Sequence, residues 1–359
     1  MIELKSVTKR YGDTTAISEL TMDVEDGQLC VLIGPSGCGK TTTLRMINRL
    51  VEPTRGAILI NGEDNRGSRP DVLRRSIGYA IQSVGLFPHM TVEQNIGTVP
   101  SILGWEKPRI ADRSRELLDM VGLDADAYAT KYPHELSGGE AQRIGVARAL
   151  AADPPILLMD EPFGAVDPLT REMLQRQFMD IQRRLKKTIV LVTHDLDEAI
   201  RMADKVAVMK SGTLVQYDTP EELLSHPADS FVRDFVGADR ALKRLSRIPV
   251  TTLMRPATSV QRGAVLSESA FAELPRYVWI VDRGTRLLGW ADTAGGPDSA
   301  RWQVDESQGR RVSVLESASL REALSLMLGQ GVRNVPVVTD DCKLMGEITL
   351  KDIEEATAE

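Results

Sequence analysis

The chain has 359 residues, which is enough for two or three domains and excludes a single small module. With 44 Lys and Arg against 51 Asp and Glu the formal net charge is −7, so no nucleic acid partner is expected. Apolar residues make up 42% and charged residues 26%, which excludes wholesale disorder. The sequence contains no stretch of roughly 18 apolar residues, and its three cysteines are widely spaced, so we expect a cytosolic protein that is neither secreted nor membrane-spanning.

In residues 1–237, short β-branched apolar runs alternate with longer helical patterns, which predicts an α/β domain on a largely parallel sheet. Between residues 91 and 152 the pattern becomes helical and poor in strands, which indicates a helical subdomain inserted between strands. Strands are predicted over residues 29–33, 156–159, 189–192 and 206–209, and helices over 109–121 and 139–151.

A phosphate-binding loop follows the first of these strands. Residues 34–41, GPSGCGKT, fit the pattern GxxxxGK[ST] and open a helical stretch over residues 42–50. Glycines let backbone amides surround a phosphate chain, Lys40 neutralises the β and γ phosphates, and the Thr41 hydroxyl binds Mg²⁺. The predicted nucleotide contacts are Gly34, Ser36, Gly37, Cys38, Gly39, Lys40, Thr41 and Thr42.

Two adjacent acids follow the strand predicted over residues 156–159. Asp160 is predicted to enter the Mg²⁺ shell and Glu161 to polarise a water molecule. Two acids at a strand end can also be a simple helix cap. The phosphate loop upstream favours the catalytic interpretation, because the two motifs together form one site.

Residues 136–142, LSGGEAQ, form a third motif. Ser137 with Glu140 three positions later is a capping box for the following helix. The Ser137 hydroxyl and the amides of Gly138 and Gly139 also form a second anion site at the helix N-terminus. The segment resembles the signature motif of ABC ATPases, which closes on the ATP bound by the partner subunit.

This resemblance covers residues 1–237, about two-thirds of the chain, and implies the P-loop NTPase fold with ATP and Mg²⁺ as ligands. Tyr11 resembles the aromatic residue that stacks on adenine, although packing is its alternative role. Gln82 matches the Q-loop residue that contacts Mg²⁺ and water, and Asp167 lies in a segment similar to the D-loop. His194 matches the switch histidine on the γ-phosphate. The resemblance implies an active ATPase that works as a head-to-tail homodimer.

Three segments resemble importer ATPases rather than exporter halves, DNA-repair proteins or translation factors: residues 87–92, 133–135 and 162–167. Residues 94–100 and 218–224, with the C-terminal region, look like the glycine betaine, carnitine and choline group of osmoprotectant importers. This resemblance implies two transmembrane permease subunits, an extracytoplasmic solute-binding protein and a peripheral position at the cytoplasmic face of the cell membrane. The alternatives are a sugar or amino-acid importer, a nucleotide-sensing regulator with a vestigial ATPase, and a soluble ABC protein without a transport role.

The remaining residues divide into a linker and a repeat. Residues 238–248 are predicted to form a basic linker helix, either a solvated face or a patch for anionic lipid headgroups, with Arg240, Lys243, Arg244 and Arg247 on one face. Residues 304–357 resemble a CBS module, and residues 249–296 look like a degenerate copy. Three tryptophans are predicted to pack within this region: Trp279, Trp290 and Trp302.

The segment GEITLKD, residues 346–352, resembles the part of a CBS module that holds adenine nucleotides. The resemblance makes Thr349 and Asp352 regulatory candidates for an adenine nucleotide or cyclic di-AMP. The corresponding segment of the first copy lacks the final Asp, so one of two clefts is expected to be lost. An ionic-strength response and a purely structural dimer clamp remain alternatives.

Overall fold

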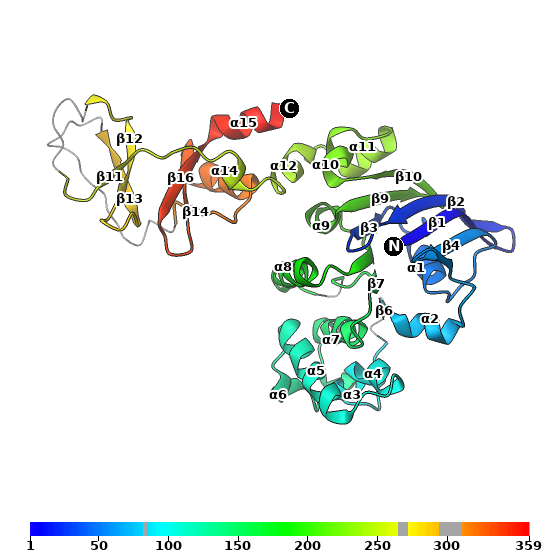
Figure 1. Cartoon of the computed structure of the whole chain (residues 1–359). Coiled ribbons are helices and arrows are strands. Elements are labelled where there is room, and N and C mark those ends of the chain that lie inside the picture. The colour runs from blue at the N-terminus through cyan, green and yellow to red at the C-terminus, as the bar shows by residue number, and fades with distance from the viewer. Residues whose placement is uncertain (82–84, 165, 265–271, 294–310, 359) are drawn as a thin grey trace. The chain divides into compact units, whose positions relative to one another are not determined.

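The computed structural model describes all residues except 82–84, 165, 265–271, 294–310 and 359 (Figure 1). Its contacts divide the chain into two compact units, Met1–Gly237 and Ala238–Glu359. Within the described ranges, none of the helices has the length and apolar character that crossing a membrane requires.

A six-stranded sheet forms the centre of the first unit, with the strand order β10-β9-β3-β8-β7-β6. Five strands run parallel and β10 runs antiparallel beside β9. Every residue of β3, β7 and β8 is buried, which is why these strands are unbroken apolar runs in the sequence. This confirms the predicted α/β fold. The strands are β3 (Leu29–Ile33), β6 (Ile77–Ala80), β7 (Ile156–Asp160), β8 (Thr188–Val192), β9 (Lys205–Lys210) and β10 (Thr213–Asp218).

A second, antiparallel sheet with the order β2-β1-β4-β5 comes from the N-terminal part of the chain. The sequence analysis did not predict it. Its longest strands carry charged residues at exposed positions, and register shifts interrupt the pairing of β1 with β2, which hides the alternation of a strand. The strands are β1 (Ile2–Tyr11), β2 (Thr14–Val24), β4 (Arg55–Ile60) and β5 (Glu63–Asp64).

Successive residues of the buried strands point to opposite faces of the six-stranded sheet. On one face, Leu32 and Leu158 pack with helix α1 (Lys40–Ile47) and the antiparallel sheet. On the other face, Val31 and Leu157 pack with the helical subdomain and with α8 (Pro168–Leu185). In the described part of the chain, both faces of the sheet are thus covered by other elements.

The helical insertion lies between β6 and β7, as predicted. Helices α5 and α7 lie within two residues of their predicted bounds, because α5 is amphipathic and α7 begins with the expected capping box. The insertion contains α3 (Val92–Ile96), α4 (Thr98–Ile102), α5 (Lys107–Met120), α6 (Ala125–Tyr128), η1 (Pro133–Glu135) and α7 (Gly138–Leu150). The other helices of this unit are α2 (Pro70–Ser76), α9 (Leu196–Met202), α10 (Pro220–Ser225) and α11 (Ser230–Val236).

The second unit contains two three-stranded sheets with the same order and directions, one parallel pair followed by one antiparallel pair. The region between β11 and β12, where the first copy's central helix is predicted, includes residues 265–271 and lies partly outside the described residues, as does Trp302. The first sheet consists of β11 (Ser259–Gln261), β12 (Tyr277–Val281) and β13 (Leu287–Asp292) and is preceded by η2 (Val250–Thr252). The second copy comprises β14 (Val314–Leu315), α14 (Leu320–Gln330), β15 (Asn334–Val338), β16 (Leu344–Thr349) and α15 (Leu350–Ala358).

The helix predicted over residues 238–248 is shorter in the structure. Helix α12 (Arg240–Leu245) ends before Arg247, so the basic residues do not all share one helical face. Leu245 is 1% exposed and lies in the apolar core of the second unit with Leu320 and Met327. Burial of this side chain fixes the segment to the second unit rather than leaving it as a free linker.

Candidate active site

The phosphate loop turns sharply after β3, and at two of its positions only glycine fits. Gly34 has φ 149° and Gly39 has φ 107°, values that side-chain-bearing residues rarely adopt. A Cβ atom on Gly34 would overlap the carbonyl oxygen of Met209, and one on Gly39 would overlap the side chain of Ile17. The missing side chains therefore let the loop lie against Met209 of β9 and Ile17 of β2.

The ammonium group of Lys40 lies inside this loop. The side chain is 8% exposed, and Nζ donates to the carbonyl oxygens of Gly34 over 2.6 Å and Pro35 over 3.1 Å. The side chain of Cys38, a residue of the loop, is buried, and its sulfur lies 3.7 Å from the same Nζ. The other predicted nucleotide contacts lie in the loop or directly after it: Ser36 and Gly37 are exposed, and Gly39 and Thr42 are half-buried.

Thr41 and Asp160 lie in contact and offer oxygen atoms that suit a divalent cation. Thr41 Oγ1, in the first turn of α1, lies 3.1 Å from Asp160 Oδ1 at the end of β7. Asp160 is 3% exposed, and burial raises the pKa of its carboxyl while the Thr41 hydroxyl opposes that shift. A hydroxyl and a carboxylate are the oxygen ligands that Mg²⁺ prefers beside phosphates, and a cation would offset the burial of the charge.

Glu161 and His194 meet at the ends of β7 and β8. Glu161 Oε1 lies 3.3 Å from His194 Nδ1. The backbone of Glu161 is left-handed, with φ 49°; its N–H donates to Val192 O over 2.9 Å, and its carbonyl accepts from Gln142 Nε2 over 2.6 Å. These bonds hold a strained residue in a fixed orientation at the carboxyl edge of the sheet, where ligands of parallel sheets bind.

The remaining predicted residues lie outside this cluster. Ser137 and Asp167 are exposed N-caps of α7 and α8, accepting the N–H groups of Glu140 and Thr170. Gly138 is exposed and Gly139 half-buried in the first turn of α7. Tyr11 is 50% exposed, and it pairs with Thr14 at the start of β2, the strand whose Ala16 lies against the loop. Gln82 lies outside the described residues.

The sequence did not predict three polar contacts near the site. Their partners are separated in sequence, or they belong to segments whose motif predicted a different role. Tyr128 donates to the Glu140 carboxylate, and this bond is the main reason that the pKa of Glu140 falls to about 2. Gln142 donates to the Glu161 carbonyl, a contact that its place in the LSGGEAQ motif did not predict. Glu198 is 5% exposed and accepts the Thr193 hydroxyl beside His194, and burial raises its pKa to about 7.

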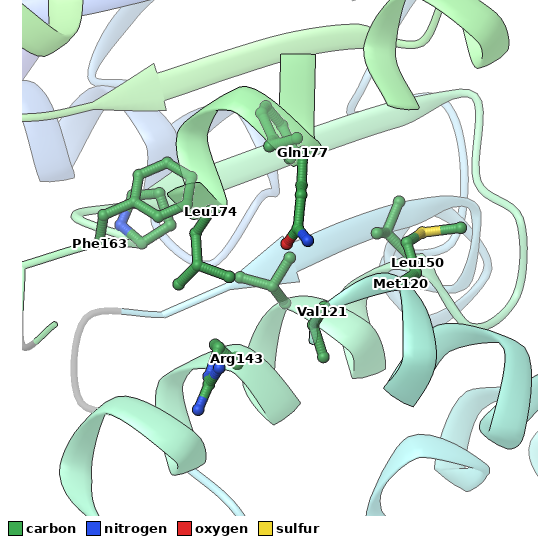
Figure 2. A pocket seen from close by; sticks show the side chains of 10 residues that line it. Met120, Val121, Arg143, Leu150, Phe163, Leu174 and Gln177 are labelled. Atoms are coloured by element: carbon green, nitrogen blue, oxygen red, sulfur yellow. The ribbon is translucent and has the colours of Figure 1, made fainter. Parts of the chain in front are cut away.

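Figure 2 shows a small apolar pocket of about 30 Å³ between α5, α7 and α8. Met120, Val121, Leu150, Phe163 and Leu174 line it with other side chains. None of the described residues predicted to bind the nucleotide lines this pocket, so it is separate from the site at the sheet edge.

The two regulatory candidates lie together in the second copy of the repeat. Asp352 is 3% exposed, and its Oδ2 accepts the N–H of Thr349 over 2.9 Å and the Thr349 hydroxyl over 2.6 Å. Its Oδ1 pairs with the guanidinium of Arg255, a residue of the first copy. Trp279 of the first copy also donates to Glu347 over 2.6 Å, so this tryptophan packs within the tail as predicted, at a contact between the copies.

Comparison with known proteins gives two family matches. The family model for ABC transporters matches residues 17–164, and the CBS domain model matches residues 310–359. The chain is 46% identical to the osmoprotectant import ATP-binding protein OsmV of Salmonella typhimurium, over 97% of this chain and 94% of that protein. It is 44% identical to the glycine betaine/carnitine/choline transport ATP-binding protein OpuCA of Bacillus subtilis, with the same coverage.

The solved structures include a dimeric ABC transporter cassette, MJ0796, with a TM-score of 0.58 and 34% identity over 61% of this chain and 99% of that one. A second structure of the same cassette is a dimer in a post-hydrolysis state with ADP and phosphate bound. It has a TM-score of 0.57 and 32% identity over the same shares of both chains.

Proposed function

Because this chain belongs to the ATP-binding subunits of osmoprotectant ABC importers, we propose that it hydrolyses ATP at the edge where β3, β7 and β8 end. The observation that supports this site best is the convergence of three contacts there. Lys40 lies within the phosphate loop, Thr41 lies 3.1 Å from Asp160, and Glu161 lies 3.3 Å from His194.

Each residue has a distinct role in this proposal. Lys40 exchanges its loop carbonyl partners for the β and γ phosphate oxygens of ATP. Thr41 and Asp160, with Gln82, would hold Mg²⁺, which neutralises charge on the phosphates. Glu161 accepts a proton from the attacking water, and His194 orients the γ-phosphate beside it.

The dimer completes the site. Ser137, with the amides of Gly138 and Gly139, is exposed in the single chain and offers an anion site to the γ-phosphate held by a second copy. The partner subunit's Ser137 then closes the site of this copy, and Asp167 approaches the same interface. Closure of such a head-to-tail dimer drives two transmembrane permease subunits, with the ATPase peripheral at the cytoplasmic face of the membrane and a solute-binding protein outside.

The cargo in this proposal is a quaternary ammonium osmoprotectant such as glycine betaine, carnitine or choline. This rests on the full-length similarity to importers with those names. The tail, residues 249–296 and 304–357, acts as a tandem CBS regulator, with an adenine nucleotide or cyclic di-AMP at Thr349 and Asp352. Such a ligand has to displace Arg255 from Asp352.

Glu161→Gln tests the ATPase. The general base is lost while size and hydrogen bonding are kept, so ATP hydrolysis should fall more than about 100-fold while ATP binding and the ATP-dependent dimer persist. Phosphate release, nucleotide titration and size-exclusion chromatography measure these three properties. Glu116→Gln, an exposed carboxylate on α5, is the matched control and should keep the wild-type rate.

Proteoliposomes with the permease subunits and solute-binding protein extend the same test to transport. Wild-type protein should drive glycine betaine uptake and Glu161→Gln should not. An unchanged hydrolysis rate in Glu161→Gln would contradict the proposed catalytic role, and uptake of a sugar instead of betaine would contradict the proposed cargo.

A further inference from the structure

A polar network joins the two loops that flank Glu161. One loop leads from Glu161 to the start of α8 and includes Val166. The other, between β8 and α9, carries His194 and then Asp195. Arg171, in the first turn of α8, touches both: its Nη2 donates to Val166 O over 2.9 Å and its Nη1 lies 3.7 Å from Asp195 Oδ2.

Both members of the ion pair are partly shielded from water. The side chain of Arg171 is 29% exposed and that of Asp195 is 35% exposed. Such a pair is screened less by salt than a pair on the open surface. The planar guanidinium fork can contact a carbonyl and a carboxylate at once, which a lysine ammonium on its single stem does less well.

Asp195 is itself held firmly next to His194. Its Oδ1 accepts the N–H groups of Asp197 and Glu198, which caps α9. Its own N–H donates to Thr193 Oγ1 over 3.0 Å, and the Thr193 hydroxyl donates to the buried Glu198 carboxyl. A displacement of the Asp195 carboxylate therefore moves the backbone that carries His194.

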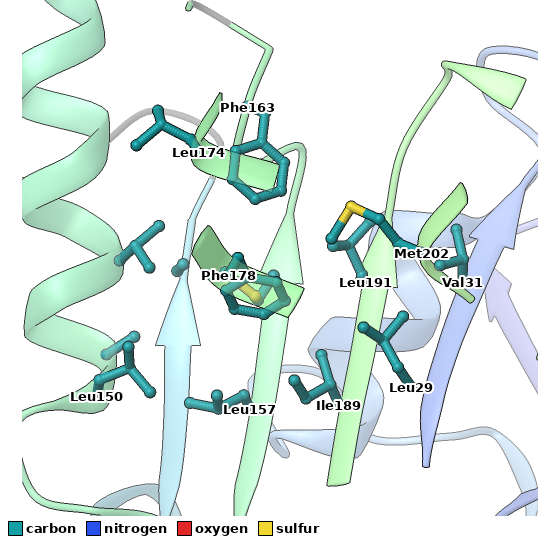
Figure 3. Close-up of a cluster of buried hydrophobic side chains, with 14 of the residues drawn as sticks. Leu29, Val31, Leu150, Leu157, Phe163, Leu174, Phe178, Ile189, Leu191 and Met202 are labelled. Atoms are coloured by element: carbon teal, nitrogen blue, oxygen red, sulfur yellow. The ribbon is translucent and has the colours of Figure 1, made fainter. Parts of the chain in front are cut away.

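Arg171 projects from a helix that the core immobilises. Leu174 and Phe178 follow it on α8 and are both 5% exposed. The ring of Phe178 meets the ring of Phe163, which follows Glu161, with centroids 6.0 Å apart and an angle of 72° (Figure 3). The helix thus provides a fixed base from which one side chain reaches both loops.

We propose that Arg171 is a positioning residue that couples the loop ending at Asp167 to the segment carrying His194. This inference rests on the proposed function, in which Asp167 lies at the dimer interface and His194 acts on the γ-phosphate. In that setting, Arg171 transmits the approach of the second copy to the geometry of Glu161 and His194, so that hydrolysis follows dimer closure. Arg171 acts on this geometry through Asp195 and Val166, the residues that its guanidinium contacts.

Arg171→Ala tests the coupling, because it should change the kcat for ATP hydrolysis but not the Kd for ATP. The kcat for ATP hydrolysis should fall about tenfold, because small displacements of catalytic groups cost that much or more. The Kd for ATP, measured in the Glu161→Gln background, should stay within about twofold, and the melting temperature of the first unit should change little. Arg171→Lys keeps the charge but not the fork and should recover part of the lost kcat.

Arg176→Ala is the matched control, since Arg176 lies on the same helix, is 67% exposed and pairs with Glu172 at 3.5 Å. It should behave as wild type. Asp195→Asn keeps the helix cap and removes the charge, so its loss of kcat should not add to that of Arg171→Ala in a double-mutant cycle.

Three results would overturn the coupling role while the wild type hydrolyses ATP: a wild-type kcat in Arg171→Ala, additive losses in the cycle, or a fall in ATP affinity equal to the fall in kcat. If Arg171→Ala fails to fold, Arg171→Lys and Asp195→Asn carry the same test. Absence of hydrolysis in the wild type would instead count against the proposed function.

Discussion

Glu198 places a buried carboxyl directly behind the segment that carries His194. Burial raises its pKa to about 7 from an ordinary value of 4.5, and neighbouring Asp195 adds to the shift. The Thr193 hydroxyl and the charges of Arg171 and His194 oppose the shift without cancelling it. At the residue scale, this one group makes the stability of the first unit depend on pH.

The expected dependence follows from proton binding. Between about pH 4.5 and 7 the folded protein keeps the Glu198 proton and the unfolded chain has lost it, so the free energy of unfolding falls as pH rises. Above pH 7 the ionised Glu198 carboxylate lowers the free energy of unfolding by its full amount, on the order of 3 kcal/mol. Glu198→Gln should therefore gain stability relative to wild type between pH 5 and pH 8, measured by urea unfolding of the first unit. Glu116→Gln should show no such gain, and an equal difference between wild type and Glu198→Gln at both pH values would refute the assignment.

At the scale of elements, α8 connects the sheet edge at which the ATPase site is proposed with the apolar core. Its N-cap, Asp167, lies in the loop after Glu161, and its buried face contributes Leu174 and Phe178 to the cluster beneath the sheet. The helix can therefore carry Arg171 in a fixed position only while that face stays packed.

Phe178→Ala should destabilise the first unit by about 3–5 kcal/mol, because it leaves a cavity beside Phe163. Phe178→Leu, which keeps most of the apolar volume, should cost clearly less. Urea midpoints for the two variants measure the difference. A wild-type midpoint in Phe178→Ala would mean that the ring contact does not anchor the helix.

At the scale of the whole molecule, the chain consists of two units with separate cores. The second unit contains a contact between its two copies, Arg255 with Asp352, at the residue for which nucleotide binding is proposed. In the proposed function, ligand binding in the tail and the pairing of the copies therefore compete for one carboxylate.

Calorimetry of the full chain tests this arrangement. MgATP should raise the melting temperature of the first unit. At a concentration of 100 times its Kd it should add about 2.7 kcal/mol to the free energy of unfolding. AMP or cyclic di-AMP should raise that of the second unit, and Asp352→Asn should abolish this shift while Asp341→Asn, in an exposed turn, keeps it. No shift with either nucleotide would leave the tail as a structural clamp or an ionic-strength sensor.

The sequence by itself determined the features that depend on contiguous residues. Spacing specified the phosphate loop, the acids after β7 and the capping box of α7, because each is built from neighbours whose backbone geometry follows local rules. It also predicted the parallel strands, since strands buried on both faces have to be apolar throughout. The antiparallel sheet escaped prediction, because half-buried strands with bulges lose that regularity.

Only the tertiary structure decided which distant side chains meet. Arg171 and Asp195 are brought together because α8 and α9 pack on the same face of the sheet. Arg255 and Asp352 meet because the two copies of the tail adjoin each other. Tyr128 reaches Glu140 because the short helix α6 lies beside the start of α7. Such pairs depend on how elements pack in three dimensions, and the local spacing of residues does not predict that packing.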